Sequence, residues 1–378
     1  MNKYHSNSIL FNYITIDQID KIQELHPLVY KFYLDENQKF TRFDDLRSCP
    51  DISNDFPCFF YLTDKDKIIS TLDALPDKLY MSEKTFPWAW AFALFTDPDY
   101  RGKGLATLLV KNMVRVLHER NIAWGGIFST PVAIRIYQKL GFTFPGYANR
   151  YLILKTARPL LDYYLKSKIL VSILNIPYCM ALHIVLMLMK RPLRPNKFNI
   201  SVERIDFDRD DLSNKNLPPL FYHTPYHFND SIEKIRWKIG KKRDIALYFV
   251  QGGSTKEYLC YFVLKDREIK EEPIAGKFIN FKLMTLMDYG VYNADINTYE
   301  ALMSTVFNLF WNSDAEVLEV MSSSKVLNSV LKRNGMVKVG KGMSFVFCAP
   351  ECWQMDQDCV ELGNWPLTHF VGNTFWFQ

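Results

Sequence analysis

Residues Trp88–Thr107, with the sequence WAWAFALFTDPDYRGKGLAT, decide how this chain folds. Their first part is an apolar run with the composition of a buried β-strand. Beyond the DPDY turn, apolar side chains recur at helical spacing from Thr107 to His118, so a helix begins in the glycine-rich loop. The unpaired N–H groups and the positive dipole end of a helix N-terminus favour a phosphate. The stretch therefore predicts a phosphate-binding corner between a strand and a helix.

The loop of this corner has the residue types that a pyrophosphate needs. Gly102 and Gly104 let the backbone approach the phosphates, where a Cβ would stand in the way. Arg101 and Lys103 add cationic donors. The predicted phosphate-binding residues are Arg101, Gly102, Lys103, Gly104, Leu105, Ala106 and Thr107.

Two motifs in order resemble one known family. Arg101-x-x-Gly104-x-Ala106 is similar to the Gln/Arg-x-x-Gly-x-Gly/Ala signature of the GCN5-related N-acetyltransferases (GNATs). The later stretch 130–142, TPVAIRIYQKLGF, resembles the helix and turn of that family, with Tyr137 four residues after an alanine and Leu-Gly-Phe behind it. The family usually has Asn at the position of Thr130. Together the two motifs cover about 96–142.

This resemblance implies an enzyme that transfers an acetyl group from acetyl-CoA to an amine by direct attack in a ternary complex. It implies that two central strands splay apart and that the backbone of Leu94, Phe95 and Thr96 binds the pantetheine arm of CoA like an added strand. Tyr137 is then the candidate general acid. Its ordinary pKa of about 10 is comparable with the value of about 8.5 for a thiol, so it is suited to protonate the leaving thiolate.

The general base is less well defined by the sequence. Members of the family often have a Glu on the strand before the loop, but residues 88–95 contain no carboxylate and no His. Asp73 on the preceding strand is the candidate, acting directly or through water. A role at a solvated strand edge is the alternative for Asp73, and His26 is expected on a helix surface.

Composition describes an ordinary globular protein. With 378 residues, 48% hydrophobic and 23% charged, the chain is long enough for two domains. The net charge of +5 is mild, and neither half shows a basic surface interleaved with aromatics, so nucleic acid is not the expected partner. Seven Cys residues form no C-x-x-C pair and no zinc spacing, so no metal is expected. Together with the polar start of the chain, this favours a cytoplasmic protein.

The first domain is expected over 1–156. The pattern predicts a strand at 8–15, a helix from Ile16 toward Val29, a hairpin from 58–63 and 68–75, and the strand at 88–95. The glycine-loop helix, a strand at 122–129, the Tyr137 helix and two last strands near 142–144 and 151–154 follow. This order of elements is similar to that of the acetyltransferase family.

A linker is expected over 157–197. Ile169–Met189 contains no charged residue and is long enough to span a bilayer, but Asn175, Pro177 and His183 interrupt it. We therefore expect linker helices buried between two domains. A peripheral or acyl-chain-binding surface is the second alternative, with membrane contact through 158–194, and a true membrane span is the least favoured one.

The second domain is expected over 198–378, and its outline resembles that of the first. Where the first domain has the glycine loop, this one has DYGVYNAD at 288–295, with one glycine and no cation. We interpret it as a degenerate copy that does not bind CoA. The predicted fold class is α/β, with two GNAT-like domains, each a mixed, mostly antiparallel sheet flanked by helices, joined by an apolar helical linker.

No motif in the sequence identifies the amine that accepts the acyl group. A small-molecule, peptide or sugar amine is expected, and the oligomeric state stays open. Trp88, Trp90 and Phe92 alternate with alanine, which favours core packing over a substrate floor. Two rival functions remain: a peripheral enzyme with a longer acyl donor, and a module that senses CoA or docks a partner without turnover.

Overall fold

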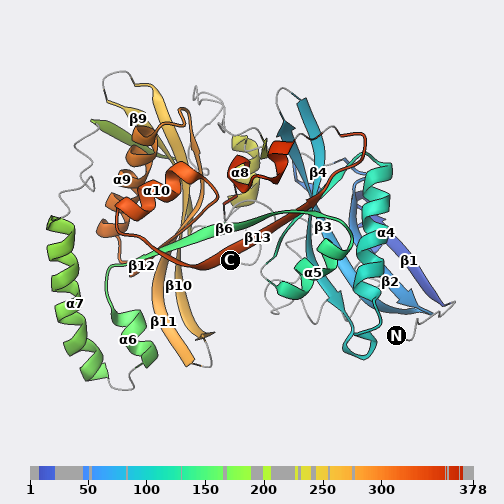
Figure 1. Ribbon diagram of the computed structural model, residues 1–378, viewed down its shortest axis with the longest axis horizontal. Coiled ribbons are helices and arrows are strands. Elements are labelled where there is room, and N and C mark those ends of the chain that lie inside the picture. Colours follow the sequence, from blue (N-terminus) through green and yellow to red (C-terminus); the bar gives the residue numbers. More distant parts are fainter. Residues whose placement is uncertain are drawn as a thin grey trace.

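The computed structural model describes most of the chain (Figure 1). The described residues are 8–21, 46–50, 53–81, 84–128, 130–164, 168–188, 199–205, 226–228, 231–239, 244–253, 256–274, 277–353, 355, 357–365 and 367–368. The helix expected toward Val29 begins as the short 3-10 turn η1 (Ile16–Gln18). Residues 22–29 of this expected helix, which include His26, lie outside the described residues.

The described residues form one thirteen-stranded sheet, in the order β1-β2-β3-β4-β5-β13-β6-β12-β11-β10-β9-β7, with β8 paired to β3. Its strands are β1 (Ile9–Thr15), β2 (Pro57–Asp64), β3 (Lys67–Met81), β4 (Lys84–Thr96), β5 (Ala123–Phe128), β6 (Thr143–Leu154), β7 (Ile200–Ile205), β8 (Tyr226–Phe228), β9 (Ile245–Gly252), β10 (Tyr258–Ile274), β11 (Lys277–Val291), β12 (Val317–Ser322) and β13 (Val337–Cys348). The helices are α4 (Leu105–Glu119), α5 (Pro131–Lys139), α6 (Arg158–Tyr164), α7 (Lys168–Leu188), α8 (Ile232–Ile239), α9 (Ile296–Asn312) and α10 (Lys325–Arg333). Short 3-10 turns are η2 (Pro98–Tyr100), η5 (Gln357–Val360) and η6 (Leu362–Asn364).

The two halves of the sheet are built alike. In the first half, α4 connects the parallel strands β4 and β5, and in the second half α9 connects the parallel strands β11 and β12. Antiparallel strands precede each of these crossovers, namely β1 to β3 in the first half and β7, β9 and β10 in the second. This mixed, mostly antiparallel sheet flanked by helices confirms the predicted α/β class.

The halves exchange their last strands. β13, from the second half, lies between β5 and β6, with Phe345 opposite Ile127 and Val337 opposite Leu152. β6, from the first half, passes on to β12, and both strands cross the middle of the molecule in Figure 1. The exchange covers strand edges that would otherwise expose unpaired backbone groups. The two short strands expected near 142–144 and 151–154 are therefore one continuous strand, and the sheet is continuous across the expected division at 156 and 198.

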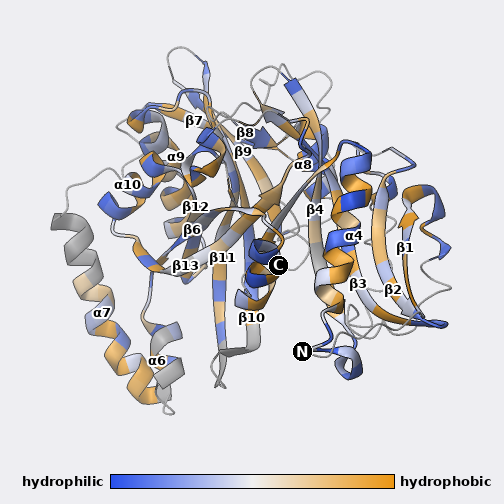
Figure 2. Cartoon of the chain, turned by 45° about the vertical axis from the view of Figure 1, so that its right-hand side comes forward, coloured by the Kyte–Doolittle hydropathy of each residue, from blue (hydrophilic) through white to orange (hydrophobic). Residues whose placement is uncertain are grey.

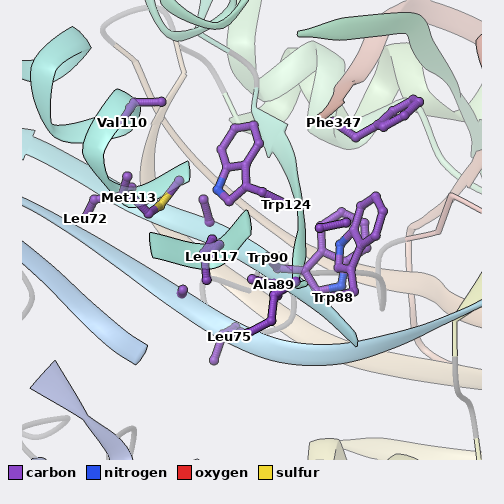
Figure 3. Close-up of a cluster of buried hydrophobic side chains, with 14 of the residues drawn as sticks. Leu72, Leu75, Trp88, Ala89, Trp90, Val110, Met113, Leu117, Trp124 and Phe347 are labelled. Carbon is purple, nitrogen blue, oxygen red and sulfur yellow. The ribbon is translucent and has the colours of Figure 1, made fainter. Parts of the chain in front are cut away.

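The tryptophans of β4 and β5 divide between the two faces of the sheet. Figure 3 shows Trp124 beside α4, whose buried residues include Val110, Met113 and Leu117. Trp88 lies on the opposite face, where a Cβ at Gly125 would approach its ring to 2.2 Å. Trp88 and Trp90 are 0% and 2% exposed, so both are core residues, as the sequence favours. The side chain of Phe92 lies outside the described residues.

The exposure of helix α7 differs from what the sequence led us to expect. We expected this segment to be buried between the domains, but Ile169, Ile173 and Ile176 are 73%, 56% and 61% exposed. Figures 1 and 2 show α7 at the outer side of the second half, next to α6. It is kept from the centre because the exchanged strands β6 and β13, not the linker, join the halves. Among the residues that the structure describes, no helix has the length and apolarity to cross a bilayer.

Candidate functional site

Strands β4 and β5 part in the middle of the first half. Their parallel pairing runs only from Trp88 opposite Ala123 to Trp90 opposite Gly125, whereas β5 stays paired with β13 along its other edge as far as Phe128. The end of β4 thus has its β5-facing edge without a partner strand among the described residues. An edge without a partner strand can accept an extended ligand as an additional strand. The parting occurs where the family resemblance implies splayed strands.

A β-bulge lies at the parted end of β4. β4 advances from Phe92 to Phe95 while β3 advances only from Asp73 to Thr71, so β4 carries one extra residue around Leu94. A bulge bends its strand and re-aims the backbone groups next to it. Nothing in the sequence signals this bulge. The bulge and the separation of β4 from β5 both take the backbone of 93–95 out of regular strand pairing.

Backbone carbonyls on this strand end are held by neighbouring side chains. The Ser70 hydroxyl donates to the Phe95 carbonyl at 2.7 Å and lies 3.0 Å from the Thr96 hydroxyl. The Arg101 Nε donates to the Thr96 carbonyl at 3.1 Å. Leu94, Phe95 and Thr96 are partly exposed. Sequence reasoning missed Ser70, because a lone serine on a strand has no signature of its own.

The glycine loop has the geometry that a phosphate needs. Gly102 and Gly104 have φ angles of +77° and +80°, a region that residues with a Cβ rarely adopt. A Cβ built at either glycine would meet no atom within 4 Å, so the space in front of the loop is open in the described structure. Gly104 is the N-cap of α4 and offers no side-chain cap. The first N–H groups of α4 are therefore left for a ligand.

The side chains of the other loop residues differ in their exposure to solvent. Leu105 is 4% exposed and packs into the core, so only its backbone N–H faces the loop end of the helix. Ala106 and Thr107 are partly exposed, and Arg101 and Lys103 are exposed. The ammonium group of Lys103 lies 4.7 Å above the Tyr100 ring. The structure thus brings all seven predicted phosphate-binding residues to one loop and helix start.

A small polar network fixes the turn before the loop. The Asp97 carboxylate accepts a hydrogen bond from the Asp99 N–H at 3.0 Å and forms an ion pair with Lys67 at 2.8 Å. The hydrogen bond from Lys67 lowers the pKa of the Asp97 carboxyl. Tyr100 donates to Asp64 at 3.2 Å. These contacts show that Asp97 caps and holds the turn η2.

Tyr137 lies in the core beneath the parted strands. It is 0% exposed, and its ring lies 4.7 Å from that of Trp124 and 5.6 Å from that of Phe142. Burial raises the pKa of its phenol, so the hydroxyl stays protonated at neutral pH. Trp124 immediately precedes Gly125, the last β5 residue that pairs with β4. Thr130 caps the Tyr137 helix α5 by accepting from the Ala133 N–H at 3.4 Å.

Asp73 is a buried carboxylate rather than a residue of a solvated edge. It is 2% exposed on β3. Leu72 lies beside Met113 of α4 (Figure 3), so the alternation of a strand turns Asp73 to the opposite face. Burial raises the pKa of the neighbouring Cys58 thiol, and the charge of Asp73 adds to that rise. Asp73 and Tyr137 therefore approach the parted strands from opposite faces of the sheet.

The corresponding helix start in the second half is already occupied by a carboxylate. Asp295 is the N-cap of α9, and its side chain accepts from the Thr298 N–H at 2.8 Å. Asp288 is 1% exposed on β11 and accepts a hydrogen bond from Thr368 at 2.8 Å. A carboxylate at a helix N-terminus repels a phosphate. The two halves thus have the same crossover but opposite charge at its helix start.

The comparisons with known proteins agree with this geometry. The model of the acetyltransferase (GNAT) domain family matches 12–144. Comparison with curated protein sequences gave no match. Saccharomyces cerevisiae N-myristoyltransferase with bound myristoyl-CoA is similar in structure at a TM-score of 0.54, with 14% identity, 91% of this chain and 84% of that chain covered.

Two bacterial structures are also similar. One is a probable N-acyltransferase of unknown function from Enterococcus faecalis V583, with a TM-score of 0.57, 12% identity, and 95% and 74% of the two chains covered. The other is a GCN5-related N-acetyltransferase from Kribbella flavida, with a TM-score of 0.54, 12% identity, and 90% and 71% covered. At these identities the likeness concerns the fold. The family match and the glycine-loop geometry together identify 12–144 as a domain of the GCN5-related N-acetyltransferase family.

Proposed function

We propose that this protein is an N-acyltransferase that transfers an acetyl group from acetyl-CoA to an amine. The observation that carries the proposal is the parting of β4 from β5 directly beside the uncapped start of α4. The open strand edge suits an extended arm such as pantetheine, and the uncapped helix start suits a pyrophosphate. CoA contains both, at the two ends of one molecule.

The residues of the corner fit CoA in that order. The backbone of Leu94, Phe95 and Thr96 binds the pantetheine arm, and Arg101–Thr107 bind the pyrophosphate. The positive φ angles of Gly102 and Gly104 turn N–H groups toward the phosphates without a side chain between them. The exposed Arg101 and Lys103 supply cations for the phosphate charge. CoA supplies the thioester, and the protein positions it.

The proposed chemistry needs one base and one acid. The amine nitrogen attacks the thioester carbonyl, the new C–N bond forms, and the C–S bond breaks. Asp73 takes the proton that the attacking nitrogen loses, directly or through water. Tyr137 gives its proton to the departing thiolate. Their approach from opposite faces of the sheet keeps the two proton transfers apart.

Acetyl-CoA binding is the first test. Acetyl-CoA at about 100 times its dissociation constant should stabilise the chain by about 2.7 kcal/mol in thermal unfolding. The double variant Arg101→Glu, Gly104→Val should abolish this stabilisation, because it reverses a charge and forces a Cβ onto a left-handed backbone.

The matched control is Arg333→Glu, Gly335→Val. It makes the same two changes at the end of α10, where Gly335 also has a φ of +80°. This control should lose stability but keep the shift with acetyl-CoA. Equal shifts in the loop variant and the control would contradict the proposed CoA site.

Replacement of Tyr137 by Phe tests the general acid. We expect kcat to fall by about 10²-fold or more, because the thiolate then leaves without a positioned proton donor. The Kd of acetyl-CoA should stay unchanged. Steady-state kinetics and calorimetry measure the two quantities separately.

Tyr151→Phe is the control for this variant, because Tyr151 is a buried tyrosine in the core of the second half. It should retain kcat. If Tyr137→Phe also retains kcat, Tyr137 is a core residue only, and the acid lies elsewhere.

For the second half, we propose a degenerate copy that does not bind CoA and helps to shape the acceptor site. The carboxylate cap at Asp295 supports this reading. A panel of small-molecule, peptide and sugar amines identifies the acceptor class, and exclusive use of small free amino acids would contradict a shared acceptor site.

A CoA-sensing module without turnover is the second candidate. It is favoured by the absence of a carboxylate from the sequence of β4, KTFPWAWAFALFT, and by the burial of Asp73. Binding of acetyl-CoA without turnover on any amine of the panel would support this candidate over the enzyme.

A further inference from the structure

Helix α7 exposes an apolar face to solvent. Its exposed large hydrophobic residues are Ile169, Leu170, Ile173, Leu174, Ile176 and Met180, with exposed fractions of 73%, 50%, 56%, 46%, 61% and 60%. Elsewhere in the described chain, exposed residues of this kind are scattered over β1, α4, α5, β7, β13 and η5. A concentration of this kind marks an interaction surface.

The side of α7 that faces the protein makes polar contacts in addition to the packing of the buried Val171. A surface helix turns its apolar stripe to the protein and its polar side to water. Here the side chain of Asn175 faces the protein and accepts from the Thr156 hydroxyl and from the Ala157 N–H, both at 2.7 Å. Tyr178 donates to the Leu154 carbonyl at 3.3 Å. Polar contacts thus help to attach α7 to the end of β6, while the three exposed isoleucines named above face outward.

The sequence on either side of the apolar part of α7 has a second feature, its charge. The sequence 166–197 contains six Lys or Arg residues and no Asp or Glu. They are Lys166, Lys168, Lys190, Arg191, Arg194 and Lys197. The stretch between Lys168 and Lys190 is uncharged. Cations at both ends of an apolar helix attract the headgroups of anionic lipids while the apolar side chains enter the acyl boundary.

We infer that α7 docks this protein on an anionic membrane surface, with the helix in the plane of the interface. The figures favour this geometry, because α7 lies at the periphery and leaves the glycine loop on the other half of the molecule (Figures 1 and 2). A bilayer that contains anionic lipids offers an apolar interior for the exposed side chains and negatively charged headgroups for the basic residues at the two ends of the helix. The inference does not depend on the proposed N-acyl transfer.

The same charge pattern disfavours a second copy of the chain as the occupant. If two α7 helices packed together, parallel or antiparallel, the basic end of one would lie beside a basic end of the other. Like charges at short distance oppose such pairing. Anionic lipid removes this conflict, because it neutralises both ends at once.

Co-sedimentation of the purified full chain with vesicles tests the inference. The chain should sediment with vesicles of equal parts phosphatidylcholine and phosphatidylglycerol, and much less with phosphatidylcholine alone or at high salt. The double variant Ile173→Glu, Ile176→Glu should reduce the partition coefficient by about tenfold or more, since it removes two apolar side chains and adds two anions.

Leu10→Glu, Val337→Glu is the matched control, because these residues are 59% and 62% exposed on β1 and β13. It should sediment as the wild-type chain does. Unchanged thermal unfolding of both variants would show that folding is intact. No sedimentation of the wild-type chain would overturn the inference. So would equal binding to neutral vesicles, or a dimer in light scattering that the α7 variant alone disrupts.

Discussion

Lys234→Met is expected to lower the free energy of unfolding by about 3–5 kcal/mol. The ammonium group of Lys234 lies 2.6 Å from an Asp77 carboxylate oxygen, and the two side chains are 1% and 2% exposed. The other carboxylate oxygen accepts from the Trp90 Nε1 at 2.7 Å. Removal of the lysine leaves the carboxylate buried without its cation. Urea unfolding of the purified variant measures the loss.

The control is Lys282→Met, which removes a cation from the exposed pair with Asp314. Solvent screens that pair, so we expect a change of about 1 kcal/mol or less. Addition of Asp77→Asn to Lys234→Met should restore part of the lost stability, because a neutral amide oxygen still accepts from Trp90 and carries no charge. A similar loss in Lys234→Met and Lys282→Met would refute a special role for the buried pair.

This pair also joins the two halves of the chain. Lys234 lies on α8 of the second half, whereas Asp77 and Trp90 lie on β3 and β4 of the first. Trp90 is the last β4 residue that pairs with β5. The pair therefore fixes the second half next to the point where the central strands part. Loss of stability and loss of acyl-CoA binding are expected to accompany each other in Lys234→Met.

Trp365→Ala is expected to destabilise the chain by about 3–5 kcal/mol, the usual cost of removing a buried large aromatic side chain. Trp365 is 0% exposed, and its ring lies 4.7 Å from that of Tyr226 and 4.8 Å from that of Phe345. Its Nε1 donates to the Cys359 carbonyl at 2.9 Å. The variant leaves a cavity and removes the hydrogen bond to the Cys359 carbonyl. Calorimetric unfolding measures the effect.

Val360→Ala serves as the neighbouring control. Val360 is 56% exposed in the same part of the chain, so we expect a change within about 0.5 kcal/mol. Trp365→Phe should fall between the two, because it keeps most of the aromatic contact and loses the hydrogen bond. If Trp365→Ala were as stable as Val360→Ala, the last described turns of the chain would contribute little to the central core.

Local features of the site are predictable from the sequence. The glycine loop follows a strand and opens a helix, as the spacing of Gly102, Gly104 and the apolar residues of α4 predicts. Interactions of this kind join residues close in sequence, so their pattern is visible in the chain itself. The Tyr137 helix α5 is predictable for the same reason.

Contacts between distant residues are not predictable in this way. The bulge around Leu94 depends on how β3 pairs with β4, and the Lys234–Asp77 pair joins residues 157 positions apart. A lysine on an amphipathic helix and an aspartate on a strand have many possible partners in solution. The apolar composition of α7 likewise misled the expectation of burial, because composition does not say which neighbours cover a helix.

The sequence by itself determined the resemblance of the first half to the GNAT family, the corner of strand, glycine loop and helix, and the α/β class, since each rests on local spacing and hydrophobic periodicity. Only the tertiary structure decided that β6 and β13 exchange places and that α7 stays exposed. It also decided that Asp73 and Tyr137 approach from opposite faces. The pairing of exchanged strands, the exposure of a helix and the side of the sheet on which a residue lies all depend on contacts between segments that are distant in sequence. Such contacts form only when the whole chain folds.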